Sequence, residues 1–219
     1  MQSGKGWKVT MIRTWLADVS VLKSEIKYQE CYQELPPERK KKADRLAREQ
    51  GRWQSVGAGV LLERMRSRYD PTGKVLYNLS HSGAYAICSM EDDERRATKL
   101  GCDIEVVKEY RRKVAARFYT ETEFHLIENC AEEEEKRELF YRFWVLKESF
   151  MKATRLGTAL SPSEFEIGFE ETGARLLGRP DEFPEPFFYR EYEAEGVEAK
   201  IAVCADADDF APELHIEIL

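Results

Sequence analysis

Apolar and polar positions along this chain follow patterns that predict both strands and helices. Short apolar or alternating stretches bounded by turn residues predict β-strands. They cover residues 9–15, 76–79, 84–90, 100–107, 164–169, 174–177, 187–192 and 200–205. Longer stretches of helical composition predict α-helices, and these cover residues 39–68, 113–129 and 138–154. Because both halves of the chain contain strands and helices, we expect an α+β fold.

Proline, glycine and charged residues refine these boundaries. Pro36-Pro37-Glu38 predicts a helix start, since proline is tolerated in a first turn and an acid there suits the helix dipole. Gly57 and Gly59 predict a break in the helix that follows. The polar stretch 91–99 is the expected boundary between an N-terminal α+β half, residues 1–97, and a C-terminal α+β half, residues 98–219.

Bulk composition excludes several classes of protein. The composition is 42% hydrophobic and 34% charged, which is typical of a soluble globular protein, and no apolar run approaches the ~20 residues of a membrane span. With only three histidines, a His-rich zinc or iron site is not expected. The net charge of −7 disfavours a nucleic-acid binder. Five scattered cysteines without a C-x-x-C pair, and no signal-peptide pattern, favour a reducing cytoplasm.

Basic residues are nevertheless clustered in the first predicted helix. Lys41, Arg45, Arg48 and Arg52 recur at helical spacing and would form one basic stripe on a continuous helix. Such a stripe is either solvated surface or a binding face for an anion.

The helix predicted at 138–154 carries a lysine where an apolar residue is expected. Its apolar arc consists of Phe140, Phe143, Trp144 and Met151. Lys147 falls inside this arc, where an unpaired ammonium is costly, so we expect an anionic partner, either a carboxylate or a phosphate. Glu148 lies at the edge of the arc and Lys152 follows one turn later, a spacing that an ordinary surface ion pair would also explain.

Two acids alternate in the strand LGCDIEVV. Asp103 and Glu105 point to the same side of an extended strand that is otherwise apolar, so they repel each other unless a cation or hydrogen-bond donors compensate. A third carboxylate, from Glu148, would complete an oxygen cage for a hard cation such as Mg²⁺. Upstream, the segment YNLSHSG places Asn78, Ser80, His81 and Ser82 close together. Such donors beside a magnesium site indicate phosphoryl chemistry.

Three motifs resemble the signatures of a known enzyme family. NLSHSG at 78–83, GCDIE at 101–105 and FW-x-x-KES-F-x-KA at 143–153 are similar, in order and spacing, to those of the 4′-phosphopantetheinyl transferases of the surfactin-synthetase-activating type. The resemblance implies two pseudo-symmetric α+β lobes in one chain, an active site at the lobe interface, and a monomer. It also implies the activity of a holo-[acyl-carrier-protein] synthase, which moves phosphopantetheine from coenzyme A to a carrier-protein serine and releases adenosine 3′,5′-bisphosphate.

The resemblance assigns roles to individual residues. It implies Mg²⁺, with Mn²⁺ as the alternative ion, held by Asp103, Glu105 and Glu148. It implies contacts with coenzyme A from Lys41, Ser80, His81, Lys147 and Lys152. His81 and Lys152 would neutralise charge during catalysis, and Glu148 is the candidate base for the serine.

The implied partners are coenzyme A and an acyl or peptidyl carrier protein, and neither nucleic acid nor a membrane. We expect the acidic carrier to land on a basic cluster consisting of Arg111, Arg112, Lys113 and Arg117. Two alternatives remain open, a catalytically inactive carrier-binding module and a metal-dependent nuclease. The nuclease is disfavoured because Val107 occupies the place where such enzymes usually carry a lysine.

Overall fold

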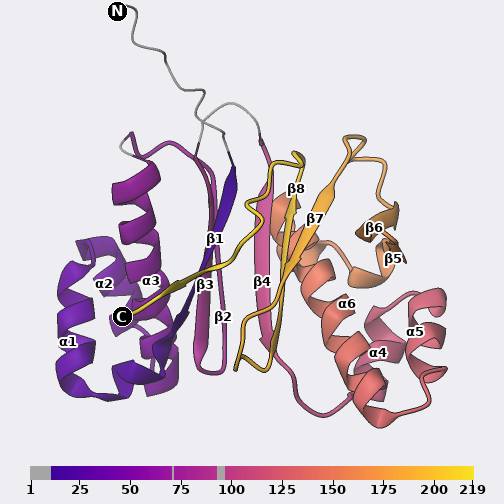
Figure 1. Ribbon diagram of the computed structural model, residues 1–219, viewed down its shortest axis with the longest axis horizontal. Coiled ribbons are helices and arrows are strands. Elements are labelled where there is room, and N and C mark those ends of the chain that lie inside the picture. The colour runs from indigo at the N-terminus through magenta and orange to yellow at the C-terminus, as the bar shows by residue number, and fades with distance from the viewer. Residues whose placement is uncertain (1–10, 71, 93–96) are drawn as a thin grey trace, which may run out of the picture.

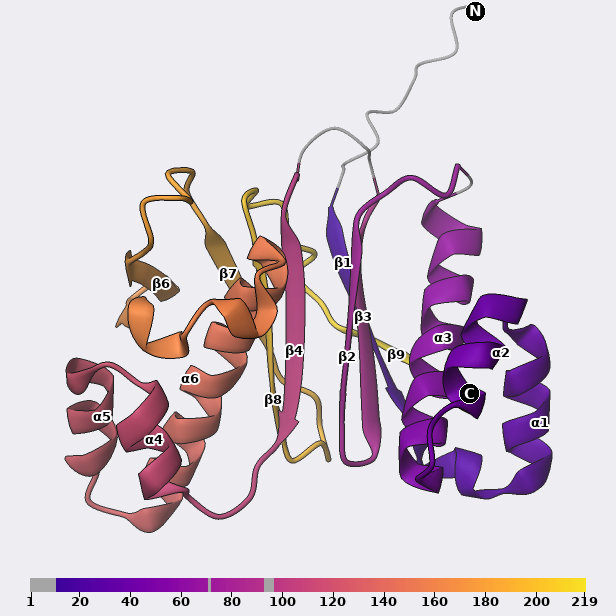
Figure 2. The ribbon, with the colours of Figure 1, turned by 180° about the vertical axis from the view of Figure 1, so that it is seen from behind.

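Two β-sheets lie side by side and helices cover their outer faces, as the computed structural model shows for residues 11–70, 72–92 and 97–219 (Figures 1 and 2). Beside the first sheet lie α1 (Glu25–Glu34), α2 (Pro37–Asp44) and α3 (Glu49–Tyr69). Beside the second lie α4 (Arg112–Phe118), α5 (Glu121–Glu128) and α6 (Glu133–Thr154). The expected α+β class is confirmed. None of the helices in these ranges has the length and hydrophobicity to cross a membrane.

The first sheet has the strand order β2-β3-β1-β9. Its strands are β2 (Tyr77–Ser82), β3 (Tyr85–Glu91), β1 (Ile12–Asp18) and β9 (His215–Glu217). β1 pairs antiparallel with β3 and parallel with β9, so the end of the chain joins the sheet of the first half. The predicted division at residues 97/98 stays a prediction, and residues 93–96 of the polar stretch lie outside the described residues, as do residues 9 and 10 of the first predicted strand.

The second sheet has the order β4-β8-β7 and is antiparallel throughout. Its strands are β4 (Leu100–Val106), β8 (Ala199–Ala205) and β7 (Phe188–Tyr192). A separate hairpin consists of β5 (Glu166–Glu170) and β6 (Gly173–Gly178), as the turn at Glu171-Thr172-Gly173 predicts. The short 3₁₀ helices η1 (Val19–Lys23), η2 (Gly157–Ala159) and η3 (Pro162–Glu164) lie in connections.

The strands β1, β3, β4 and β8 bury both faces, which explains their strongly apolar sequences. In β1, Ile12 and Leu16 belong to a hydrophobic cluster shared by the two sheets. The alternate residues Trp15 and Ala17 belong to the cluster under α3. A third cluster packs α6 with α4, α5 and the outer face of the second sheet. Each sheet thus lies between its own helices and the other sheet.

The contact between α6 and β4 is unusually close because β4 carries a glycine there. A Cβ atom at Gly101 would lie 2.1 Å from Ser149 O and 2.4 Å from Ala153 N. Only a residue without a side chain allows the helix backbone to approach this strand. This contact brings the C-terminal half of α6, with Glu148 and Lys152, to the acids of β4.

The predicted helix at 39–68 breaks in a different place from the one expected. It ends at Asp44 and resumes at Glu49, and α3 continues through Gly57 and Gly59. A Cβ at Gly57 would lie 2.3 Å from Val19 Cγ1, and one at Gly59 would lie 2.7 Å from Leu35 Cδ2. These glycines permit close packing instead of ending the helix. Because the break falls at residues 45–48, the proposed single basic stripe does not lie on one helix.

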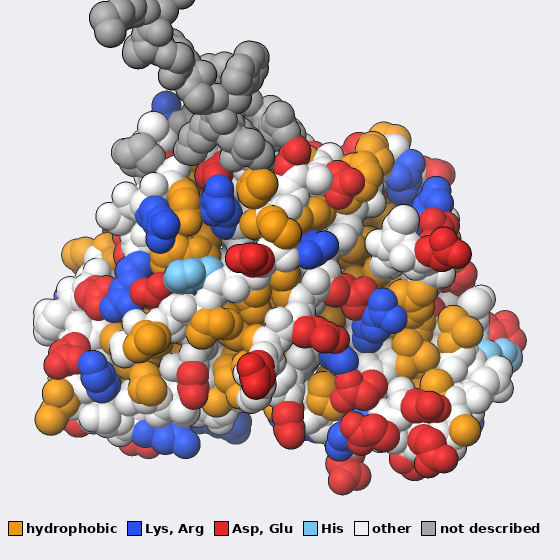
Figure 3. Space-filling model, in the orientation of Figure 1, with side chains coloured by type: hydrophobic (Ala, Val, Ile, Leu, Met, Phe, Trp, Pro, Cys, Tyr) orange, Lys and Arg blue, Asp and Glu red, His pale blue; other side chains and the backbone are white. Residues whose placement is uncertain are grey.

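The region predicted as one helix at 113–129 also consists of two helices. α4 ends at Phe118. The side chain of Thr120 caps α5 by accepting a hydrogen bond from Glu123 N, and the Glu123 carboxylate accepts one from Thr120 N. α6 begins at Glu133, earlier than residue 138, because acidic side chains suit the first turn of a helix. Figure 3 shows acidic side chains gathered over this part of the molecule, at the lower right.

Candidate active site

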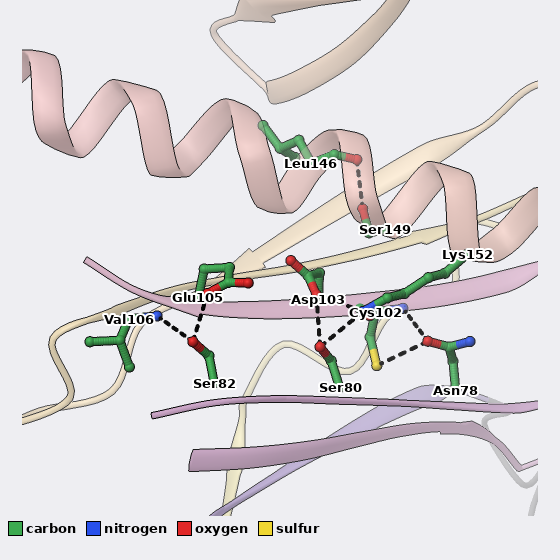
Figure 4. Close-up of polar contacts among 10 residues, drawn as sticks. All are labelled: Asn78, Ser80, Ser82, Cys102, Asp103, Glu105, Val106, Leu146, Ser149 and Lys152. Carbon is green, nitrogen blue, oxygen red and sulfur yellow. Dashed lines mark hydrogen bonds and ion pairs between the residues drawn. The ribbon is translucent and has the colours of Figure 1, made fainter. Parts of the chain in front are cut away.

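Polar side chains of β2 line the seam between the two sheets. β2 and β4 are the neighbouring edge strands, and alternate residues of β2 point towards β4 (Figure 4). Cys102 N donates to Asn78 Oδ1 at 3.0 Å, and Val106 N donates to Ser82 Oγ at 3.2 Å. The NLSHSG motif is therefore polar at every second position because its side chains satisfy backbone amides at the edge of β4.

Asp103 forms the centre of the site. It is 3% exposed, and its Oδ1 accepts hydrogen bonds from Ser80 Oγ at 2.7 Å and Lys152 Nζ at 2.6 Å. Lys152 also donates to Ser80 Oγ at 2.9 Å and to Cys102 O at 3.2 Å. The structure thus brings together Ser80, Asp103 and Lys152, which belong to three different motifs.

Glu105 and Glu148 lie near Asp103, and the three carboxylates interact electrostatically. Burial raises the pKa of Glu105, and the charge of Asp103 raises it further, while a hydrogen bond from Ser82 opposes the change. Burial likewise raises the pKa of Glu148, with further contributions from Asp103 and Glu105. The charge of Asp103 therefore makes ionisation of Glu105 and Glu148 less favourable, an effect that a bound cation would reverse.

The donor set fits a hard divalent cation. Asp103 Oδ2 is buried and has no hydrogen-bond partner within the described ranges, so one oxygen at the centre of the site is unsatisfied. Carboxylate oxygens are the ligands that Mg²⁺ prefers. Across residues 11–70, 72–92 and 97–219, no three His, Cys, Asp or Glu side chains are already arranged around a common metal position. The chemistry of the acids suits the ion. Hydrogen bonds from Ser80 and Lys152 hold the Asp103 side chain, and one from Ser82 holds that of Glu105.

His81 lies on β2 next to these residues, with its side chain exposed. Loss of hydration lowers the pKa of His81, and the positive charges of Lys152 and Lys42 lower it further. The charge from α2 that lowers this pKa is that of Lys42. Lys41 of the same helix is exposed, and its expected contact with coenzyme A stays a prediction.

Lys147 does not join this group of residues. Its ammonium is buried and forms an ion pair with Glu123 Oε1 at 2.8 Å. It also donates to Pro162 O and Phe165 O, both at 2.7 Å. The expected anionic partner is therefore a carboxylate of α5. The prediction that Lys147 binds the cofactor is wrong for this structure, because protein oxygens already surround its ammonium.

Two residues that the sequence analysis did not select carry unsatisfied polar atoms. Arg39 Nε and Ser55 Oγ are buried without a hydrogen-bond partner among the described residues, and Arg39 Nη2 makes only a long contact of 3.5 Å with Ser55 O. Burial lowers the pKa of Arg39. An incompletely paired guanidinium beside a free hydroxyl suits an anionic group. The sequence could have indicated Ser55, because it is a polar residue next to the apolar run of α3.

A pocket of about 420 Å³ opens beside Glu105. Its lining residues are Glu105, Lys108, Glu109, Arg111, Val114, Phe140, Tyr141 and Trp144. The aromatic side chains come from α6, so the helix that carries Glu148 also forms an apolar wall next to the acids. The site therefore offers both charged and apolar surface.

Comparisons with known proteins find similarity to one family of enzymes. A family model described as the 4′-phosphopantetheinyl transferase superfamily matches residues 99–204. A 4′-phosphopantetheinyl transferase of Bacillus subtilis is 31% identical over 141 residues, which cover 64% of this chain and 59% of that protein. The Sfp transferase of B. subtilis strain 168 is 30% identical over 138 residues, covering 63% of this chain and 58% of that protein. The match thus spans about three fifths of these relatives.

Solved structures are less similar. The holo-[acyl-carrier-protein] synthase of Thermotoga maritima has a TM-score of 0.42 and 22% identity, and the match covers 50% of this chain and 62% of that chain. The corresponding enzyme of Bacillus anthracis, in complex with CoA (3′,5′-ADP), has a TM-score of 0.40 and 18% identity, with 50% of this chain and 96% of that chain covered.

Proposed function

Since this chain belongs to the 4′-phosphopantetheinyl transferase superfamily, we propose that it transfers the phosphopantetheine group of coenzyme A to a serine of an apo carrier protein. The products are the holo carrier and adenosine 3′,5′-bisphosphate. The observation that carries the proposal is the convergence of Asp103, Lys152 and Ser80 at the seam between the sheets, with Glu105 and Glu148 beside them.

The acids would hold the divalent ion. Asp103, Glu105 and Glu148 are the residues that bind it, and it is Mg²⁺, with Mn²⁺ as the alternative. Its contribution is to neutralise charge on the diphosphate of coenzyme A. The unsatisfied Asp103 Oδ2 and the raised pKa values of Glu105 and Glu148, to which burial and then the charge of Asp103 contribute, support this assignment.

Basic residues would bind the phosphates. Lys152 is positioned with its side chain 27% exposed, so a phosphate oxygen can reach its ammonium. His81 of β2 lies near enough to Lys152 and to Lys42 of α2 for both positive charges to lower its pKa. As the P–O bond to the leaving group breaks, negative charge develops on the leaving oxygen, and Lys152 and His81 stabilise it.

Glu148 is our candidate for the base. The serine Oγ forms a bond to phosphorus, its proton passes to the Glu148 carboxylate, and the bond to adenosine 3′,5′-bisphosphate breaks. Glu148 is only partly buried, which leaves it accessible to a hydroxyl. Glu148→Gln should lower the rate at saturating Mg²⁺. If the loss disappears at high Mg²⁺, Glu148 acts only in metal binding.

The carrier would bind along α4. Arg111, Lys113 and Arg117 are exposed there, and Arg111 lines the pocket beside Glu105. Arg112 is also exposed, but it is engaged with Glu128 at 2.7 Å. Because the residues of the site all come from one chain, we propose that the enzyme acts as a monomer.

The direct test is to incubate the protein with coenzyme A, Mg²⁺ and an apo carrier protein, and to follow the carrier by mass spectrometry. We expect a mass gain of one phosphopantetheine group, which EDTA abolishes. Asp103→Asn provides a variant that keeps the side-chain shape and should lose activity. An unmodified carrier across a panel of acyl and peptidyl carriers would refute the proposal.

A further inference from the structure

Ser82 is a buried hydroxyl of the NLSHSG motif that has no role in the chemistry above. It lies on β2 and is 7% exposed. Its Oγ donates to Glu105 Oε2 at 2.6 Å and accepts from Val106 N at 3.2 Å (Figure 4). A single side chain of the first sheet thus contacts both a candidate metal ligand and the backbone beside it in the second sheet.

The contact repeats the one that Ser80 makes. Ser80 and Ser82 are two residues apart on β2, and their partners Asp103 and Glu105 are two residues apart on β4. Because alternate residues of a strand point to the same side, the two serines lie opposite the two acids. The result is a ladder of two hydroxyl–carboxylate bonds across the seam.

The backbone bond determines which way the Ser82 hydroxyl points. Val107 N donates to Glu198 O on the β8 side, so the neighbouring Val106 amide faces the opposite edge of β4 and requires an acceptor. Ser82 Oγ accepts that bond and keeps its own hydrogen for Glu105. The serine is therefore a directed donor, and it restricts the rotation of a side chain that would otherwise have several rotamers.

We infer that Ser82 is a positioning residue that keeps the Glu105 carboxylate at the seam between the sheets, where the divalent cation would bind, and joins that candidate ligand to the other sheet. This inference rests on the proposed function, because it assumes that Glu105 binds the ion. Partners that orient a metal ligand typically contribute 10–100-fold to metal affinity.

The test measures Mn²⁺ binding by electron paramagnetic resonance in the presence of adenosine 3′,5′-bisphosphate, without a carrier protein. We expect Ser82→Ala to weaken Mn²⁺ binding about tenfold or more, and Ser82→Thr, which keeps the hydroxyl, to restore most of it. Ser89→Ala is the matched control, because Ser89 is also a buried serine, lies on the adjacent strand and bonds to Thr14 Oγ1 at 2.9 Å instead of to a candidate metal ligand. Its Mn²⁺ affinity should equal that of the unchanged protein.

A double-mutant cycle identifies the route of the effect. If Ser82 acts through Glu105, then Ser82→Ala should have no further effect on Mn²⁺ affinity in a Glu105→Gln background. Ser82→Cys, which keeps the shape but donates weakly, gives the same measurement if Ser82→Ala does not fold.

Two results would overturn this inference without affecting the proposed function. One is a Mn²⁺ affinity of Ser82→Ala equal to that of Ser89→Ala. The other is an effect of Ser82→Ala on Mn²⁺ affinity that is as large in the Glu105→Gln background as in the unchanged protein. Absence of Mn²⁺ binding by the unchanged protein would overturn both this inference and the metal dependence of the proposed function. The two failures are therefore distinguishable.

Discussion

The buried ion pair between Glu123 and Lys147 allows a quantitative prediction. Glu123 is completely buried, and besides Lys147 its carboxylate accepts hydrogen bonds from Ile167 N at 2.8 Å and Thr120 N at 2.9 Å. Lys147→Met removes the only charged partner of this carboxylate within the described contacts but fills much of the same volume. An uncompensated charge in a buried pair costs about 3–5 kcal/mol of stability. For a chain of this size, this corresponds to a fall in the melting temperature of roughly 10 °C.

The double variant separates charge from packing. Glu123→Gln in the Lys147→Met background removes the unpaired charge and retains an oxygen that can accept from Ile167 N. It should therefore recover about 2 kcal/mol or more of the lost free energy of unfolding. Urea denaturation of the four proteins of the cycle measures the coupling. Among molecules that remain folded, the KM for coenzyme A should be unchanged, because Lys147 contacts protein oxygens.

The opposite pattern would refute this reasoning. If Lys147→Met kept its stability but raised the KM for coenzyme A, the lysine would serve the cofactor and not the fold. If the double variant were as unstable as the single one, the loss would come from packing, and the charge of Glu123 would not be its cause.

Three further predictions concern the approach of α6, the carrier and pH. Gly101→Ala should destabilise the protein and lower activity, because a Cβ would lie 2.1 Å from Ser149 O; activity that equals the unchanged protein would contradict the close contact. Arg117→Glu should weaken carrier binding, most strongly at low salt, whereas Arg175→Glu, an exposed control on β6, should not. Equal kinetics for the two variants would show that the basic cluster does not bind the carrier. Folding lowers the pKa of His81, so the unfolded state binds a proton at higher pH than the folded state does. The free energy of unfolding should therefore fall as the pH drops through the ordinary histidine value of about 6.5, and it should level off below the folded pKa. His81→Gln should reduce this slope in denaturation curves measured between about pH 5 and 7; an identical slope would show that His81 is not the titrating group.

The local pattern of the chain was sufficient for several features of the site. Asp103 and Glu105 had to share one side of their strand, because successive residues of a strand alternate. Lys147 had to meet an anion, because its helix buries the arc on which it lies. The Pro37 helix start and the β5–β6 hairpin followed from local turn and capping preferences in the same way.

Tertiary packing decided which partners these residues meet. Glu123 is 24 residues before Lys147 in the numbering, and nothing in the helix pattern distinguishes its carboxylate from a phosphate of a ligand. Gly57 is indistinguishable from a helix breaker in the sequence, and only its contact with Val19 shows that it permits close packing. The charge of Lys42 on α2 lowers the pKa of His81 on β2 only because the fold brings these two segments near each other.

The amino-acid sequence by itself determined which chemical groups this protein possesses and on which side of a strand or helix each one lies, because these depend on short-range geometry. Only the tertiary structure decided that β2 and β4 become neighbouring edges, so that Ser80 meets Asp103 and Ser82 meets Glu105. Contacts between segments that are distant along the chain depend on how the two sheets pack together. That packing is a property of the whole core, to which the residues of the motifs contribute only a small part.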